Sequence, residues 1–191
     1  TDEYRALWNQ QPERHTNRDG ESLFLSLAVP NATQVLLAEL DRFLLNVERS
    51  PDSVHLVRTA ADLDRAREAG KISLLMAANR ADWFGDSPGV LRQFARLGLR
   101  MITIGQATRE LGWDPSNEVR SGGRLTELGV RLIAEMNQCG ILIDLAHSND
   151  PCALDVIDLS TMPVVDTHSA PRALYPGENR PIPDEVMRAM S

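Results

Sequence analysis

The chain has 191 residues, 42% of them hydrophobic, and a formal net charge of −7, which suits one globular domain with a sizeable core. The acidic balance and the lack of a lysine and arginine cluster argue against nucleic acid or an anionic membrane as the main partner. No apolar run approaches the roughly 20 residues of a membrane span, and two cysteines are too few for a disulfide framework, so we expect a reducing, cytoplasmic setting.

From the N-terminus, strand-like and helical segments alternate. Residues 22–29 have the apolar pattern of a strand, and residues 31–50 place their apolar side chains on one helical face. A short extended segment at 54–57 then leads into a second predicted helix over residues 58–71. Thr59 is typical of a helix start, and a glycine near the end of that segment is typical of a helix stop.

The middle of the chain repeats this order with clearer boundaries. Residues 71–78 are predicted to form a buried strand and residues 99–104 another, with a helix between them over 86–98. That helix has Ser87 as its N-cap, a proline at its first position and a glycine past its end. The segment 105–124 that follows is a loop long enough to predict a functional role.

The last third predicts one more helix and then two strands that flank a helix. An apolar stripe over residues 125–140 predicts the first helix, short apolar runs at 141–145 and 163–166 predict the strands, and residues 151–160 predict the helix between them. Near-continuous apolar strands that alternate with helices are typical of a parallel α/β fold. Such folds place their functional residues beyond the C-terminal strand ends.

Two histidines, His147 and His168, lie at such positions, each just after a predicted strand. Adjacent parallel strands end at the same edge of a sheet, so we expect the two rings side by side. The spacing leaves two interpretations open: hydrogen-bonding residues at strand ends, or two ligands of one zinc ion. Asp144 and Asp166 are candidates to orient the second ring nitrogens. The serine after each histidine is not expected to be a nucleophile, because neither lies in a G-x-S-x-G elbow.

Longer stretches resemble a known family. The segments "LTELGVRLIAEMNQCGILIDLAHSN" and "APRALYPGENRPIPDEVMRAM" are similar to motifs of the renal (membrane) dipeptidase family of zinc peptidases, which carries "EMNRLGxLVDLSH" and "RNVPDDVL". Upstream, "VRTAADLDRAREAGKISLLMA" resembles the family's approach to its "EGG" motif, and "SPGVLRQFARLGLRMITI" resembles its "LRxFYxLGVRYLTLTH". The likeness runs from about residue 22 to the C-terminus.

This resemblance implies a metal-dependent barrel hydrolase. The implied fold is a TIM-type (β/α)8 barrel, and the implied reaction is attack of zinc-activated water on the peptide bond of a dipeptide. The family's two late histidines, both ligands of one zinc, match His147 and His168. Its substrate-binding arginine matches Arg180, whose planar guanidinium suits the carboxylate of a dipeptide or similar small substrate. One or two zinc ions and a homodimer are further implications.

Several positions depart from the family's motifs. The glutamate that bridges the two metals in the family matches Asn79, whose neutral amide supplies no anionic bridge. The two following glycines match Arg80 and Ala81, and the family's substrate-holding histidine matches Gln106. We therefore expect Asn79 and Gln106 at the substrate site and an impaired second zinc site.

The resemblance also covers only part of the family's barrel. Material for about five of eight strands is found, so residues 1–191 are predicted to form a single, incomplete barrel domain. The family's first metal ligands form an H-x-D motif, and Asp2 is the candidate for its aspartate. The family's late catalytic aspartate has no counterpart before Ser191, so no catalytic residue is assigned.

Three functional hypotheses remain. The first is a dipeptidase-like zinc hydrolase. The second is a catalytically inactive, truncated barrel homologue that acts as a binding or structural subunit, which Asn79 and Arg80 favour. The third is another amidohydrolase-type barrel with a single metal and a non-peptide substrate, which accounts for the histidine pair but explains the stretch over residues 125–190 poorly.

Overall fold

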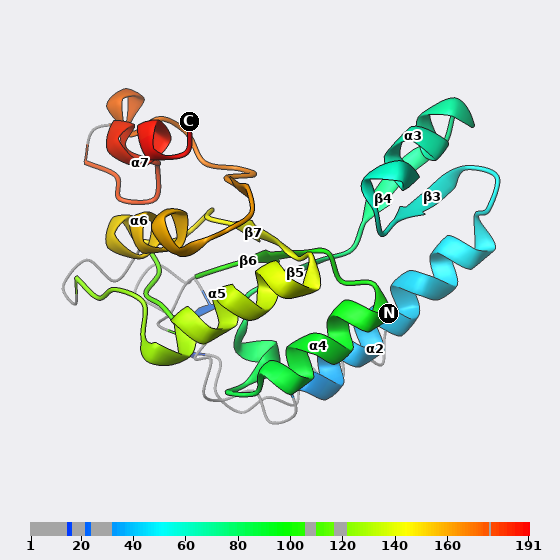
Figure 1. Cartoon of the computed structure of the whole chain (residues 1–191), viewed down its shortest axis with the longest axis horizontal. Helices are drawn as coiled ribbons and strands as arrows, with labels where there is room; N and C mark the ends of the chain where they lie inside the picture. The colour runs from blue at the N-terminus through cyan, green and yellow to red at the C-terminus, as the bar shows by residue number, and fades with distance from the viewer. Residues whose placement is uncertain (1–14, 17–21, 24–31, 106–109, 117–121, 176) are drawn as a thin grey trace.

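The structure, a computed structural model, describes residues 15–16, 22–23, 32–105, 110–116, 122–175 and 177–191. Among these residues, parallel strands alternate with helices (Figure 1). The chain therefore has the α/β fold with parallel sheets that the sequence predicts. Two residues expected near the functional site, Asp2 and Gln106, lie outside the described residues.

Four parallel strands form the sheet that carries the candidate site, in the order β5-β6-β7-β8. They are β5 (Ala77–Asn79), β6 (Met101–Thr103), β7 (Leu142–Asp144) and β8 (Val164–Val165). A separate parallel pair consists of β3 (Val54–Val57) and β4 (Ile72–Leu75). In Figure 1 this pair and α3 (Ala60–Glu68) project from the rest of the molecule.

Two strand predictions differ from the structure. In the first predicted strand, 22–29, only β2 (Ser22–Leu23) is described, and it pairs antiparallel with β1 (His15–Thr16). The predicted buried strand 71–78 divides at Met76, because β4 pairs with β3 whereas β5 pairs with β6. β4 is also not buried, since its Ile72 side chain is 64% exposed. Because β4 pairs with β3, it is not part of the four-stranded sheet that the helices cover.

The five helices that the sequence predicts lie within a few residues of their expected bounds, and a further helix over residues 184–189 was not predicted. The remaining ones are α2 (Ala32–Arg49), α4 (Pro88–Leu97), α5 (Glu127–Cys139), α6 (Asp150–Leu159) and α7 (Asp184–Ala189), with 3-10 helices η2 (Asp82–Phe84) and η3 (Arg172–Leu174). Ser87 caps α4 by accepting the Val90 N–H, and Gly98 ends it with a left-handed φ of 113°. Within the described ranges, no helix combines the length and apolar character that a membrane crossing requires.

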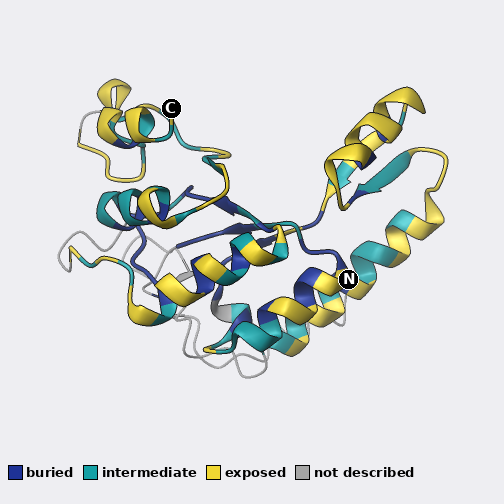
Figure 2. Cartoon of the chain, viewed as in Figure 1, coloured by how far each residue is buried: buried dark blue, intermediate teal, exposed yellow. Residues whose placement is uncertain are grey.

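The core lies between the four-stranded sheet and the helices α4 and α5 (Figure 2). Its central side chains are fully buried and come from both layers: Ile102 and Ile143 from the sheet, and Leu91, Phe94, Leu132 and Met136 from the helices. Each such side chain contributes about 1.5–3 kcal/mol of transfer free energy. This packing fixes the strands whose C-terminal ends carry the candidate site.

Part of the long predicted loop packs tightly on α5. The carbonyl of Gly112 accepts a hydrogen bond from the Thr126 N–H at 2.9 Å, and the Thr126 hydroxyl caps α5 by accepting from the Gly129 N–H. A Cβ atom added at Gly129 would overlap the carbonyl oxygen of Gly112. The close approach of this loop to the helix therefore requires glycine at position 129.

Replacing Gly129 by alanine is expected to lower the free energy of unfolding by about 1–3 kcal/mol, because the added methyl group must displace backbone atoms. This loss outweighs the gain of about 1 kcal/mol that alanine brings to an unconstrained helix position. Urea denaturation measures the difference. Gly89→Ala in α4 is the control, since its Cβ would meet only side-chain atoms, the Ser87 hydroxyl at 3.4 Å and the Arg92 Nη2 atom at 3.7 Å. Equal stabilities for the two variants would contradict the proposed close approach.

Candidate functional site

The candidate site forms at the C-terminal ends of β7 and β8. Sheet register pairs Asp144 of β7 directly with Val165 of β8. His147 and His168 each follow this pair by three residues, so equal offsets bring the two rings to the same place. Their Nε2 atoms are 3.0 Å apart and their ring centroids 4.9 Å apart. The structure thus brings together the two histidines that the sequence predicted side by side.

The backbone of His147 is held in an unusual conformation by the loop at residues 110–116. Its φ of 69° lies in the left-handed region, which costs a non-glycine residue of order 1 kcal/mol. The Ser116 N–H donates to the His147 carbonyl at 2.7 Å, and the Asn149 N–H donates to the Asp114 carbonyl at 3.1 Å. These two hydrogen bonds clamp the turn after β7. The functional role predicted for this loop therefore includes holding His147.

Asp144 lies directly beneath the histidine pair and is completely buried. One carboxylate oxygen accepts hydrogen bonds from the hydroxyls of Thr103 and Thr167, both at 2.7 Å. The other oxygen accepts from the backbone N–H groups of Ala146 and Thr167, at 3.2 and 3.0 Å. A carboxylate can accept all four of these hydrogen bonds. They offset the cost of burying this group away from water. Asp144 thereby joins the ends of β6, β7 and β8.

The same network fixes the proton positions on His168. The Thr167 hydroxyl has one proton, which it donates to Asp144, so it must accept from the Nδ1–H of His168 at 2.7 Å. In a neutral ring with this proton, the Nε2 atom of His168 has a lone pair, and it faces the Nε2 atom of His147. This is the form of the ring that can bind a metal through Nε2 or accept the Nε2–H of His147.

Arg180 also contacts the His147 ring. Its Nε–H donates to the Nδ1 atom of His147 at 3.5 Å, and its Nη2 atom lies 3.3 Å from the ring's Nε2 atom. Burial and then the positive charge of Arg180 lower the pKa of His147, because both disfavour the charged imidazolium. Burial and the neighbouring arginine therefore both favour the neutral form of the half-buried ring.

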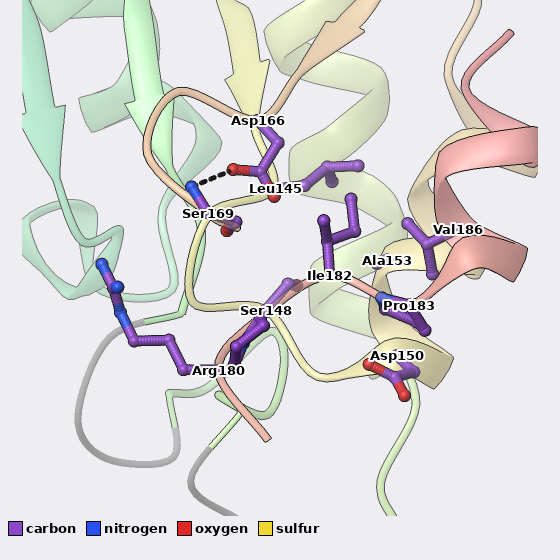
Figure 3. A pocket seen from close by; sticks show the side chains of 11 residues that line it. Leu145, Ser148, Asp150, Ala153, Asp166, Ser169, Arg180, Ile182, Pro183 and Val186 are labelled. Atoms are coloured by element: carbon purple, nitrogen blue, oxygen red, sulfur yellow. Dashed lines mark hydrogen bonds between the residues drawn. The ribbon is translucent and has the colours of Figure 1, made fainter. Parts of the chain in front are cut away.

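The two aspartates proposed to orient the histidines behave differently from the expectation. Asp166 accepts the backbone N–H of Ser169 at 2.9 Å, the bond drawn in Figure 3. Asp144 connects to His168 through Thr167, and its direct bonds go to neither ring. The expectation came from the alternation of side chains along a strand, which indicates which side chains share a face. Thr167, whose hydroxyl joins Asp144 to His168, belongs to the turn after β8, where side chains do not alternate in this way.

A small pocket is lined by Ser148 and Ser169, which follow the two histidines, and by Arg180 (Figure 3). Its apolar lining includes Leu145, Ala153, Ile182, Pro183 and Val186, and Asp150 and Asp166 contribute carboxylates. In Figure 3 the Arg180 side chain extends away from Ile182 and Val186. The buried Ser148 hydroxyl has no hydrogen-bond partner among the described residues.

Comparison with known proteins matches residues 6–191 to the membrane dipeptidases, peptidase family M19. The chain belongs to this family. It is 33% identical to dipeptidase tcpJ of Claviceps purpurea over 150 residues, which are 78% of this chain and 35% of that protein. It is 30% identical to dipeptidase verJ of Clonostachys rogersoniana over 179 residues, which are 92% of this chain and 44% of that protein. The M19 chain thus spans less than half the length of these relatives.

Solved structures agree with this membership. An amidohydrolase from Pseudomonas aeruginosa superposes with a TM-score of 0.77 at 29% identity, covering 82% of this M19 chain and 47% of that one. A metallopeptidase from Rhodobacter sphaeroides, liganded with a phosphinate mimic of the dipeptide L-Ala-D-Ala, gives a TM-score of 0.74 at 29% identity, with coverages of 83% and 46%. The parallel α/β arrangement is therefore shared with these two enzymes.

Asn79 and Arg80, which depart from the M19 motifs, lie at the end of β5. Asn79 ends β5 and pairs with Thr103 of β6, so it stands level with Asp144 across the sheet. Arg80 has a φ of 99°, in the region that favours glycine. The family motif places a glycine there, which supports the match of Asn79 and Arg80 to the "EG" of "EGG". Arg80 is also buried, only 8% exposed.

The histidine pair fits part of a zinc site. Two imidazole nitrogens 3.0 Å apart can both lie about 2.1 Å from one cation. Within the described ranges, no group of three or more His, Cys, Asp or Glu side chains is placed to hold a metal ion. The pair therefore accounts for two ligands. The expected third candidate, Asp2, lies outside these ranges.

Sequence reasoning missed three residues that build this site. Thr103 and Thr167 hold Asp144, and Arg172 contacts the segment that carries Arg180. A threonine carries no motif signal, because its role depends on a partner 41 or 23 residues away. Arg172 could have been noticed from the sequence, since it stands in the "APRAL" stretch of the family resemblance.

Replacing Arg180 by glutamine in the metal-free protein is expected to raise the pKa of His147 toward its ordinary value near 6.5, because a nearby cation is removed. NMR titration of the ring protons measures the pKa. The control is Arg67→Gln, which removes the same charge at an exposed position of α3 that pairs with Asp64. A His147 pKa that is the same in both variants would contradict the observed contact.

Proposed function

We propose that this chain is a zinc-dependent, dipeptidase-like hydrolase. In this proposal His147 and His168 bind one zinc ion, and Arg180 binds the carboxylate of a dipeptide or a similar small substrate. The observation that carries it is the 3.0 Å approach of two Nε2 atoms directly beside a guanidinium group. Membership of the M19 family supports the reaction type. The liganded Rhodobacter sphaeroides relative supports a dipeptide as the substrate class.

We further propose that the parallel sheet is part of a TIM-type (β/α)8 barrel. The support is the shared arrangement with M19 structures, of which this chain covers somewhat less than half. In a barrel of this kind, functional residues gather at the C-terminal ends of the strands. The positions of His147 and His168 agree with that arrangement. The residues that complete the barrel would also supply the remaining metal ligands.

The residues of the chain divide the chemistry between them. Zinc, when bound, lowers the pKa of a coordinated water and polarises the peptide carbonyl. Thr167 and Asp144 hold His168 with its Nε2 lone pair toward the site. Arg180 forms paired hydrogen bonds with a carboxylate, which orients the peptide bond.

The contact between Arg180 and His147 would change if His147 held a metal. A neutral His147 ring that offered its Nε2 atom to a cation would carry its proton on Nδ1. The Nε–H of Arg180 would then lose its present acceptor, the Nδ1 atom of His147. The guanidinium group would become available to a substrate carboxylate.

A second candidate function has its own support. Asn79 provides no anionic bridge for two metals, and Arg80 places a cation beside that position. Both features favour a catalytically inactive homologue that binds a metal or a ligand as a structural subunit. The two candidates share the histidine site and differ in turnover. Zinc binding without hydrolysis of L-Ala-D-Ala would favour the inactive homologue.

Zinc content is the first test of the site. The purified chain is expected to contain about one zinc per molecule, and His168→Ala is expected to lose it while circular dichroism stays unchanged. The reason is that two ligands alone leave no substitute for a missing imidazole. His55→Ala is the control, because His55 lies in β3, away from the pair. Zinc retained in His168→Ala would remove that residue from the site.

Restoring the family's carboxylate tests the interpretation of Asn79. Asn79→Glu is expected to raise the zinc content from about one toward two per chain, because an anionic bridge compensates the repulsion between two dications. Asn79→Gln has similar size without the charge and is expected to leave the content at one. An equal zinc content in both variants, measured by elemental analysis, would contradict the assigned position.

A homodimer and a cytoplasmic location stay predictions.

A further inference from the structure

We propose that Arg172 is a positioning residue that holds Arg180 over His147. This inference rests on the proposed function of Arg180 as the carboxylate-binding residue. Arg172 lies at the start of η3, four residues after His168, and its side chain is about three-quarters buried, with 28% exposed. It contacts the backbone on both sides of Arg180.

The contacts of Arg172 form a clamp around the Arg180 peptide. Its Nη2 atom donates to the carbonyl of Asn179 at 3.0 Å, and its Nε atom donates to the carbonyl of Pro181 at 2.9 Å. These are the residues immediately before and after Arg180. The clamp therefore fixes the direction in which the Arg180 side chain leaves the backbone.

The clamp is anchored to a helix. Both terminal nitrogens of Arg172 bind the Asp150 carboxylate, at 2.5 and 2.7 Å, in the paired geometry that arginine forms with carboxylates. Asp150 is the first residue of α6, which packs on the core through Cys152 and Val156. Because Asp150 occupies both terminal nitrogens of the Arg172 guanidinium group, Arg172 is not itself available to bind a substrate carboxylate.

Backbone hydrogen bonds close the same loop. The Arg172 N–H donates to the Ile182 carbonyl at 2.8 Å, and the Ile182 N–H donates to the Ala170 carbonyl at 2.9 Å. The Arg172 side chain reaches across the loop that these bonds close. The side chain of Arg180 itself hydrogen-bonds only to His147 within the described part of the chain. Its placement therefore depends on the clamped backbone.

Two measurements test this role, and one needs neither metal nor turnover. In metal-free protein at fixed pH, Arg172→Gln is expected to shift the NMR signals of the His147 ring in the same direction as Arg180→Gln. The double variant is expected to add nothing further, because both changes remove one contact. Arg172→Lys keeps the charge and loses the fork, so it is expected to behave like Arg172→Gln. Unchanged His147 signals in Arg172→Gln would overturn the proposal.

The second measurement uses two small probes, N-acetylglycine and its neutral amide, with binding followed by calorimetry on the zinc-loaded chain. The chain is expected to prefer the carboxylate by about tenfold, in line with a charge-assisted hydrogen-bond pair. Arg180→Gln and Arg172→Gln are each expected to abolish the preference, and the double variant to match Arg180→Gln. If each single variant lost part of the carboxylate preference and the double variant lost the product of the two, Arg172 would act separately from Arg180. That result would overturn the positioning role.

Controls separate the possible failures. Arg188→Gln removes an arginine that pairs with Asp184 in α7, and it is expected to keep both the NMR signals and the preference. Thermal unfolding verifies that each variant is folded at the assay temperature. A wild-type chain without any carboxylate preference would refute the proposed role of Arg180. The NMR comparison would still decide whether Arg172 positions that residue.

Discussion

The buried carboxylate of Asp144 is the interaction on which the site depends. It accepts four hydrogen bonds, from the strand end of β6, from its own turn and from the turn after β8. Loss of this carboxylate would leave buried donors unpaired, at a cost of about 1–3 kcal/mol for each one. Through Thr167 the same carboxylate sets which nitrogen of His168 faces His147. One charge thus controls both the alignment of three strands and the chemical form of a ring.

The sequence predicted the parts of the fold that local patterns determine. Helix ends followed from Ser87 and Gly98, because a capping hydroxyl and a left-handed glycine act within a few residues of the backbone that they terminate. The proximity of His147 and His168 followed from the topology of parallel strands. The break of the strand at Met76 was not predictable, since it depends on which strand pairs with each half.

Most of the polar support of the site was also beyond the sequence. Thr103 and Thr167 act on a partner that is distant in the chain, and their residue type carries no periodic signal. Arg172 lies in a stretch that the family resemblance covers, but the resemblance does not give its contacts. The family resemblance identified Arg180 as the carboxylate-binding candidate, and the structure places it against His147. The resemblance could not show that the Arg180 side chain donates a hydrogen bond to His147. That contact depends on the backbone geometry of both turns.

The two parts of the proposed site differ in how well they match the family's motifs. After β7 and β8, His147 and His168 lie together, and Asp144 supports His168 through Thr167. At the end of β5, Asn79 stands where the resemblance places the family's glutamate, and Arg80 has a backbone conformation suited to glycine. This conformation agrees with the proposed match of Arg80 to a glycine of the motif.

The equal three-residue offset of His147 and His168 from a single pair of strand residues has an evolutionary consequence. One inserted or deleted residue between Asp144 and His147, or between Val165 and His168, would rotate one ring out of reach of the other. Lineages that keep this centre should therefore keep the lengths of both turns constant. Within the second turn they should also keep a hydroxyl at position 167, because it joins Asp144 to His168.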